Sequence, residues 1–205
     1  MHRFKGMRLI LLLQGAVLVA LPALSVPQSV MAAGEFGVRA GIGADGNDYS
    51  SREIYWRPAG LGPRFGDRRG WHLAGFTEFN AARVRLGGDA MSTGGVSVGA
   101  WLTSPAQPLS FGLGTGPTYI SERRLGGREF GGHWQFTSHA AVRLRVADNL
   151  SIGYRIQHTS NAGRRSPNQG YDIQALEVRL TFEGIVQCFP VPRASRLRLE
   201  HSSKC

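Results

Sequence analysis

Apolar and polar residues alternate with a period of two in several separate stretches of the chain. The alternation is most regular in four stretches, where every second residue is apolar and most residues between them are glycine or polar: 36–42, 96–102, 150–156 and 176–182. Successive side chains of a β-strand point to opposite faces, so this pattern is typical of a strand with one apolar face. We predict a strand in each stretch.

Four other stretches alternate less regularly, at residues 50–57, 70–80, 109–120 and 132–145. Segments rich in Gly, Pro, Ser, Asn and Asp, which favour turns, separate the eight stretches: 45–48, 60–70, 87–89, 103–108 and 125–127. Beyond residue 33 no stretch shows the period of an amphipathic helix. The pattern therefore predicts an all-β protein with eight antiparallel strands.

Two architectures fit eight strands of this kind. In a soluble sandwich or lipocalin-like barrel the apolar face points inward, whereas in an outer-membrane barrel it contacts lipid and small or polar residues fill the interior. Here the second face is rich in Gly, Ser, Thr, Gln and Arg, and the last stretch ends in Phe182, as outer-membrane strands often do. We therefore predict an eight-stranded antiparallel transmembrane β-barrel of the outer-membrane type over residues 34–182.

The first 33 residues have the pattern of a cleaved signal peptide. Basic residues precede an apolar run at 9–24, and the small residues Ala32 and Ala33 offer a cleavage site. A single anchoring helix is the alternative, but Pro22 ends the run short of the ~20 residues that a spanning helix needs. We expect an exported protein of the cell outer membrane.

Residues 183–205 depart from the strand pattern. This stretch is basic, interrupted by proline, and contains Cys188 and Cys205, the 2 cysteines of the chain. It is predicted to be an appended tail of unknown role, and a disulfide between the two cysteines is an open alternative.

The charge balance is basic, with 24 Lys and Arg against 14 Asp and Glu. No basic stripe with interleaved aromatic residues accompanies it, so a nucleic-acid partner is not expected, and outer-membrane lipids with an anionic surface are the better partner. Unpaired buried charges are costly. Interior acids are therefore expected to pair with interior arginines: Glu78 and Glu177 with residues such as Arg143, Arg155 or Arg179.

His133 and His139 lie six residues apart on one face of the stretch 132–145. Interior polar residues and metal ligands are the two alternatives. No carboxylate or cysteine pattern accompanies the histidines, so we favour interior polar residues and predict no metal site.

The residues that carry candidate chemistry surround the turn between the last two predicted strands. His158 and Ser160 continue the apolar, even-numbered series of 150–156, and Asp172 shares the parity of 176–182. All three would emerge on the lipid-facing side at one end of a single hairpin. A serine nucleophile needs an adjacent base, and the base needs a third group to orient it, so Ser160 would attack, His158 would take the proton and Asp172 would orient His158.

The same turn offers hydrogen-bond donors for a developing oxyanion. The turn Asn161–Gly163 and the amide of Asn168 could supply them. The alternative is ordinary turn chemistry near a membrane surface, for which Asn and Gly are common.

The hairpin motif resembles the PagL family of outer-membrane lipid A 3-O-deacylases. The resemblance rests on His158-Thr-Ser160-Asn161-Ala-Gly163, followed by Pro167-Asn168-Gln169-Gly170 and an acid at 172; weaker matches lie at 114–121 and 135–138, and the similarity covers roughly 34–182. It implies an eight-stranded barrel with its active site on the outer surface, His158 as base, Ser160 as nucleophile, and Asn168 and the backbone near Gly163 as oxyanion donors. The family has a glutamate where this chain has Asp172, and its chains end near residue 182.

The resemblance also implies the reaction and the substrate. A serine-type ester hydrolase, without cofactor, would remove the 3-O-linked 3-hydroxyacyl chain from lipid A of lipopolysaccharide. Apolar contact could come from Ile152, Ile156 and Leu176, and Arg164 or Arg165 could face the lipid A phosphates; for the arginines, a solvated loop charge is the alternative.

Two other functions share the predicted strands and signal peptide. One is a non-catalytic small outer-membrane barrel that serves as an anchor or adhesin, which would have no reason for the His-x-Ser and acid arrangement. The other is an acyltransferase that uses the same serine with an acceptor other than water. The sequence leaves open the oligomeric state, a homodimer included, and the preferred acyl-chain length.

Overall fold

A computed structural model describes residues 33–44, 48–66 and 69–182. The predicted tail, and the predicted signal peptide except residue 33, lie outside these residues. Eight of the strands are ten residues or longer: β1 (Gly34–Gly43), β2 (Tyr49–Pro58), β4 (His72–Leu86), β5 (Asp89–Thr103), β6 (Leu109–Ile120), β9 (Trp134–Arg145), β10 (Leu150–Ser160) and β11 (Tyr171–Phe182). Three strands have two residues each: β3 (Arg64–Phe65), β7 (Arg124–Leu125) and β8 (Arg128–Glu129).

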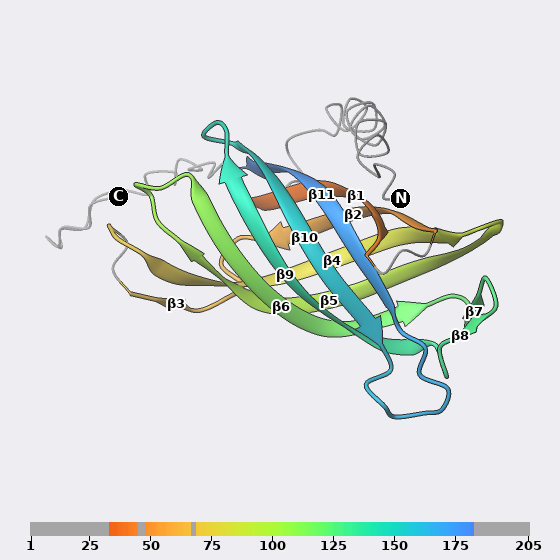
Figure 1. Cartoon of the computed structure of the whole chain (residues 1–205). Coiled ribbons are helices and arrows are strands. Elements are labelled where there is room, and N and C mark those ends of the chain that lie inside the picture. The colour runs from red at the N-terminus through yellow and green to blue at the C-terminus, as the bar shows by residue number, and fades with distance from the viewer. Residues whose placement is uncertain (1–32, 45–47, 67–68, 183–205) are drawn as a thin grey trace, which may run out of the picture.

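The long strands form one closed antiparallel barrel (Figure 1). Each long strand pairs with two others, and the first and last close the ring, since Gly34 of β1 lies opposite Phe182 of β11. The all-β fold with eight antiparallel strands is thus confirmed. Within the described part of the chain, no helix has the length and hydropathy needed to cross a bilayer.

The eight predicted stretches each fall on one long strand, but β4 and β5 extend further than predicted. The additional residues lie around the turn at Gly87 and Gly88 and follow the opposite pattern: Val84 and Met91 are buried, whereas Arg83 and Arg85 are exposed. Here the apolar face points into the barrel and the polar face outward, which is the arrangement for a strand surrounded by water. The prediction missed these residues because the rule for a lipid-facing strand does not hold there.

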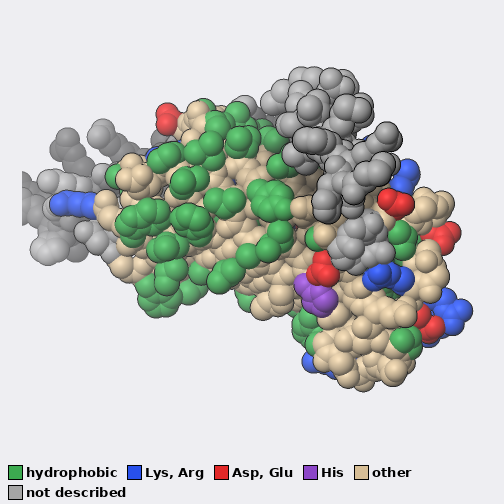
Figure 2. Space-filling view, in the orientation of Figure 1, with side chains coloured by type: hydrophobic (Ala, Val, Ile, Leu, Met, Phe, Trp, Pro, Cys, Tyr) green, Lys and Arg blue, Asp and Glu red, His purple; other side chains and the backbone are tan. Residues whose placement is uncertain are grey.

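Apolar side chains cover the middle of the outer wall. Leu113, Val98 and Ile54 are 67%, 55% and 50% exposed, and the residues between them in each strand point inward. Figure 2 shows this apolar surface, with charged side chains gathering at the right-hand end of the view, where Figure 1 places β7, β8 and the β10–β11 loop. The wall therefore has the apolar band that contact with lipid requires.

Buried arginines and glutamates fill much of the interior. Arg39 contacts Glu53, Glu78 and Glu177, so one guanidinium joins three strands. The two predicted acids pair as expected with two of the arginines, through Glu78–Arg155 at 2.9 Å and Glu177–Arg143 at 3.2 Å. The third arginine, Arg179, binds Glu35 instead, because closure of the barrel places β1 beside β11.

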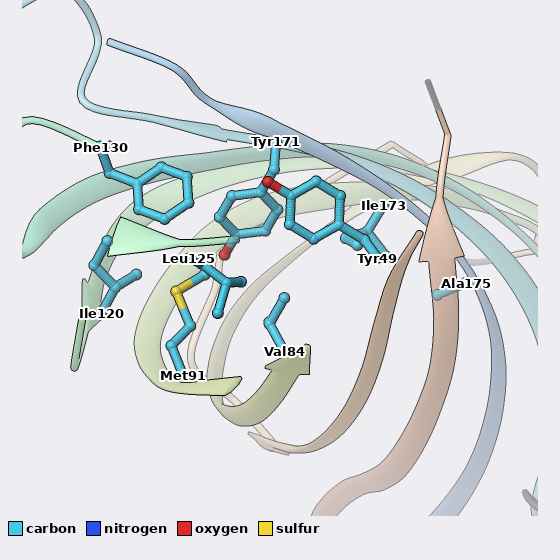
Figure 3. Packing of buried hydrophobic residues seen from close by; sticks show 9 residues of the cluster. All are labelled: Tyr49, Val84, Met91, Ile120, Leu125, Phe130, Tyr171, Ile173 and Ala175. Atoms are coloured by element: carbon cyan, nitrogen blue, oxygen red, sulfur yellow. The ribbon is translucent and has the colours of Figure 1, made fainter. Parts of the chain in front are cut away.

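An apolar cluster closes the interior at one end of the barrel (Figure 3). It combines strand residues with side chains from the loop between β6 and β9: Tyr49, Val84, Met91, Ile120, Leu125, Phe130, Tyr171, Ile173 and Ala175. Leu125 ends β7 and Phe130 follows β8, so their burial anchors the β7–β8 hairpin onto the barrel end. We call this group the cap cluster; the hairpin that it anchors lies next to the β10–β11 loop.

Candidate functional site

His158 and Asp172 form a hydrogen-bonded pair on the outer wall. They lie directly opposite each other in β10 and β11, and His158 Nδ1 is 2.8 Å from Asp172 Oδ1. Their side chains are 56% and 44% exposed. The strand period places both on the outer face, as predicted, and the direct register lets the short aspartate reach the imidazole.

Ser160 lies two residues beyond His158 on the same face, where β10 ends. Among the hydrogen bonds of the described residues, none joins Ser160 to His158. Both side chains nevertheless border one small space: a Cβ added to Gly170 would lie 2.9 Å from Ser160 Cβ and 3.1 Å from His158 Cε1. The structure thus brings together the three residues predicted as nucleophile, base and acid, and the absence of a side chain at Gly170 leaves room between two of them.

The inner face of the same strand end is held in place by hydroxyl groups. Thr159, between His158 and Ser160 in sequence, points inward and is 1% exposed. Its Oγ1 lies 2.9 Å from that of Thr137, which lies 2.8 Å from that of Thr118. These contacts link β10 to β9 and β6, so the backbone that carries the two outward side chains has little freedom to shift.

Asn161 supports the loop that follows Ser160. It is 2% exposed, and its Nδ2 donates to the carbonyls of Phe130, Arg165 and Pro167 at 3.0, 2.8 and 3.3 Å. Its backbone N–H donates to Asn168 Oδ1 at 2.9 Å. Both donors of Asn161 are therefore used within the protein, which matches a supporting role rather than donation to a ligand.

The other two predicted oxyanion residues lie on the exposed part of the loop. Ala162 and Gly163 have positive φ angles of 55° and 74°, which turn the chain sharply after Asn161. Gly163 has open space around its Cα. Because Asn168 accepts through Oδ1, its Nδ2 is directed away from that bond, and among the described residues nothing accepts a hydrogen bond from it.

The β7–β8 hairpin holds both ends of this loop, a role that the sequence reasoning missed. Arg128 Nη1 donates to the carbonyl of Gly170 at 3.2 Å, and the backbone N–H of Glu129 donates to Gln169 Oε1 at 2.8 Å. The bond from Asn161 to Phe130 adds a contact at the other end. In the sequence these residues have the composition of a turn, and no local pattern marks them as neighbours of residues 31 to 42 positions away.

The two candidate arginines of the loop take different directions. The guanidinium of Arg164 stacks over the ring of Phe136, with its Cζ 4.6 Å from the ring centre. Phe136 is the partner of Ser160 in β9, so Arg164 borders the outer face beside the serine. The Arg165 side chain lies beside Gly132, on the side of the β6–β9 loop. Only Arg164 is thus placed beside the candidate nucleophile.

The predicted apolar contact residues lie on the outer wall of β10 and β11, further from the β10–β11 loop than His158. Ile156 and Ile152 are 49% and 45% exposed, and Leu176 is half-buried opposite Tyr154. The Tyr154 hydroxyl donates to Gln174 Oε1 at 2.7 Å, which satisfies the polar end of this outward ring. The wall next to the pair is therefore apolar and open. A cavity of about 270 Å³ lies at the far end of the barrel, beside Glu35 and Arg143, away from these residues.

The two histidines of the stretch 132–145 occupy different places. His139 is 6% exposed inside the barrel and packs against Phe76, as expected of an interior residue. His133 precedes β9; its Nδ1 lies 2.8 Å from the carbonyl oxygen of Ile120, and its ring stacks on Tyr119. Across the described ranges, no three His, Cys, Asp or Glu side chains gather in a group that could hold a metal ion.

Comparison with known proteins gives consistent matches. The family model "Lipid A 3-O-deacylase (PagL)" matches residues 52–181. The lipid A deacylase PagL of Pseudomonas aeruginosa is 27% identical over 169 residues, covering 80% of this chain and 95% of the relative. The lipid A deacylase PagL of Bordetella bronchiseptica is 35% identical over 69 residues, 34% of this chain and 36% of the relative. The crystal structure of the outer membrane enzyme PagL aligns with a TM-score of 0.61 at 17% identity, over 72% of this chain and 99% of that one, which supports the barrel fold.

Proposed function

The chain belongs to the PagL family of lipid A 3-O-deacylases, which are outer-membrane ester hydrolases, and from this premise we propose that it hydrolyses the lipid A ester with Ser160, His158 and Asp172. The bond cleaved is the one that holds a 3-hydroxyacyl chain at position 3 of lipid A. The observation that carries the proposal is the pair His158–Asp172, hydrogen-bonded at 2.8 Å and facing the lipid beside a serine. A polar pair on a lipid-facing wall is energetically costly, so its presence there indicates a function.

The reaction follows from the roles of the three side chains. Ser160 Oγ attacks the ester carbonyl carbon while His158 Nε2 takes the hydroxyl proton, and Asp172 keeps the other ring proton on Nδ1 and stabilises the imidazolium. Collapse of the tetrahedral intermediate breaks the bond to the sugar oxygen, which receives the proton from His158. A water molecule, activated by the same imidazole, then releases the fatty acid and regenerates Ser160.

We expect the donors for the oxyanion to come from the loop that follows Ser160. The exposed Nδ2 of Asn168 and the backbone N–H groups near Gly163 are the candidates, because Asn161 has its donors engaged in the loop. Hydrogen bonds directed at the developing negative charge contribute more to the transition state than to the bound ester.

The outer wall suits a substrate that remains in the membrane. Acyl chains would lie against Ile152, Ile156 and Leu176, while the ester reaches the end of β10. Arg164, beside Ser160, would contact a lipid A phosphate, since a guanidinium binds phosphate through paired hydrogen bonds. Arg165 lies on the other side of the loop and would contribute less.

The experiment is expression of the full chain in an outer membrane, followed by mass spectrometry of lipid A. The native protein should remove one 3-hydroxyacyl group, and Ser160→Ala and His158→Asn should reduce removal by at least about 10³-fold while the barrels still fold. The intact mass of the purified protein would also test cleavage of the proposed signal peptide after residue 33. Unchanged lipid A with folded native protein would favour the anchor or adhesin, and an acylated acceptor other than water would favour the acyltransferase.

A further inference from the structure

The cavity at the far end of the barrel takes no part in the proposed reaction. It has a volume of about 270 Å³ and lies at the end where Gly34 of β1 is paired with Phe182 of β11. Part of its lining is aromatic, with the buried rings of Phe76 and Trp101. Exposed residues of the β2–β4 connection, such as Leu61, complete the lining, so the cavity is open to the surface. It can therefore admit a small molecule at the end of the barrel opposite to the proposed active site.

Four arginines and one glutamate also line this cavity. Three of the arginines contact the glutamate, Glu35: Arg57 at 3.2 Å, Arg143 at 3.8 Å, and Arg179. The fourth arginine, Arg64, is exposed, and among the described residues no carboxylate forms an ion pair with it. At the wall of the cavity, a single carboxylate is therefore shared by three guanidinium groups.

The other glutamates of the interior do not supply the missing negative charge. Inside the barrel, the ion pairs of the described residues join five arginines to four glutamates: Arg39, Arg57, Arg143, Arg155 and Arg179 to Glu35, Glu53, Glu78 and Glu177. Within the described ranges, Arg179 has no carboxylate partner besides the shared Glu35. The network therefore has one positive charge in excess, and an excess charge in a barrel interior is unfavourable. An anion in the cavity would compensate it.

Two N–H groups beside the cavity lack an acceptor. Trp101 Nε1 and Arg179 Nε are buried, and among the described residues nothing accepts a hydrogen bond from either. The other nitrogens of Arg179 are used, since one donates to Glu35 and the other donates to Ser151 Oγ at 2.7 Å. The positive ends of the two free N–H dipoles are therefore not neutralised, and they add to the attraction of this wall for an anion.

We infer that this cavity is a binding site for a small organic acid. The carboxylate would lie beside Arg57, Arg143 and Arg179, because guanidinium groups bind carboxylates through paired, charge-assisted hydrogen bonds. The apolar part of the acid would lie against Phe76 and Trp101, where it is removed from water. The cavity is several times larger than the ~30 Å³ that one water molecule occupies in the liquid, so it has room for more than an inorganic ion. The site does not involve the proposed catalytic residues and goes beyond the proposed hydrolysis.

The test uses the full chain, purified in detergent from an outer membrane, and measures binding of radiolabelled benzoate by equilibrium dialysis. Benzamide, which has nearly the same shape without the charge, is the paired probe, and dialysis against empty micelles corrects for partition into detergent. The native protein should bind benzoate at least about tenfold more tightly than benzamide, the difference expected when the hydrogen bonds of an arginine go to a charged acceptor. Inorganic phosphate at the same concentration should displace little of the bound benzoate, because it has no apolar part.

Two variants should shift the affinity for benzoate in opposite directions. Arg179→Gln removes the excess positive charge and should weaken binding about tenfold, whereas Glu35→Gln removes the competing carboxylate and should strengthen binding about threefold or more. Arg145→Gln is the matched control. Arg145 lies on β9 two residues beyond Arg143, is exposed and does not line the cavity, so this variant should keep the native affinity.

Three results would overturn the site: no saturable binding of benzoate to the folded native protein, equal affinity for benzoate and benzamide, or the same loss of affinity in Arg145→Gln as in Arg179→Gln. The last result would show that benzoate responds to the net charge of the barrel end and not to the cavity. If Glu35→Gln does not fold, the comparison of Arg179→Gln with Arg145→Gln decides. Full displacement of benzoate by an equal concentration of phosphate would overturn the assignment to an organic acid. Each of these results leaves the proposed hydrolysis standing, because lipid A takes no part in the measurement.

Discussion

Charged side chains occupy two regions of this barrel, the interior and the outer wall at its loop end, and they are arranged differently in the two. In the interior, the single side chain of Arg39 contacts three glutamates, and all four side chains are almost fully buried. On the wall, His158 and Asp172 contact each other and remain about half exposed. Arg39, Arg143 and Arg155 of the interior each pair with at least one glutamate, whereas among the described residues nothing hydrogen-bonds to Nε2 of His158.

The difference separates structural from chemical roles. A buried network of opposite charges holds strands together only while each charge keeps its partners, because an unpaired buried ion is strongly unfavourable. The pair on the wall joins only β10 and β11, which are already paired along their length, so its loss leaves the other strand contacts in place. We therefore expect substitutions in the interior to change folding and substitutions on the wall to change the reaction. Four variants, in order of decreasing expected effect, test this separation.

The largest effect is expected for Glu78→Gln in the interior. Glu78 pairs with Arg39, Arg57 and Arg155, and among the described residues it is the one ion-pair partner of Arg155. The variant should lose about 3–5 kcal/mol of folding free energy in a urea titration of the barrel in detergent, with the rate per folded molecule unchanged. Glu129→Gln, in the exposed pair with Arg124, should lose less than about 1 kcal/mol. Equal losses would contradict the distinction.

Asp172→Asn should lower kcat about 100-fold. An asparagine amide donates where the carboxylate accepts, so it favours the imidazole tautomer with its proton on Nε2, which cannot take the serine proton. Asp172→Glu should stay within about threefold of the native kcat, because the charge and the acceptor are kept. Rates on the ester substrate measure both variants. Native kcat in Asp172→Asn would remove this residue from the mechanism.

Gly170→Ala should lower kcat about tenfold with little change in KM. The added methyl group would lie 2.6 Å from the backbone oxygen of Thr159, 2.9 Å from Ser160 Cβ and 3.1 Å from His158 Cε1. The end of β10 that carries the two side chains must therefore shift, and small displacements at a reacting centre are costly. Gly88→Ala is the matched control, because nothing lies within 4 Å of a Cβ there and its φ is ordinary. A raised KM with native kcat would show that Gly170 acts on binding instead.

The smallest effect is expected for Arg164→Gln, about a threefold rise in KM for a phosphorylated substrate. The lost interaction is one exposed charge with phosphate, which salt screens. Arg165→Gln, whose side chain lies beside Gly132, should change KM less. Repeating both measurements on a dephosphorylated substrate should remove the difference between the variants; a difference that persists would show that Arg164 does not contact phosphate.

Much of this architecture could be predicted from the residue pattern alone. A strand alternates its side chains with a period of two, so the parity of His158, Ser160 and Asp172 with their apolar neighbours was enough to place all three on the outer face. The same rule failed for the ends of β4 and β5, where Val84 and Met91 point inward. Periodicity shows that a strand has two faces, but the surroundings decide which face is apolar.

Pairings between distant segments depended on the closed barrel. The partner of Arg179 is Glu35, which lies 144 residues away and comes into reach only when β1 meets β11. The contact of Arg128 with Gly170 and the direct register of His158 with Asp172 likewise depend on how the loops and strands are aligned. The alternation of faces is a local property of each strand, so the order of residues within the strand is enough to predict it. Register and closure are set by all strands together, because a shift of one strand changes every neighbour across the sheet.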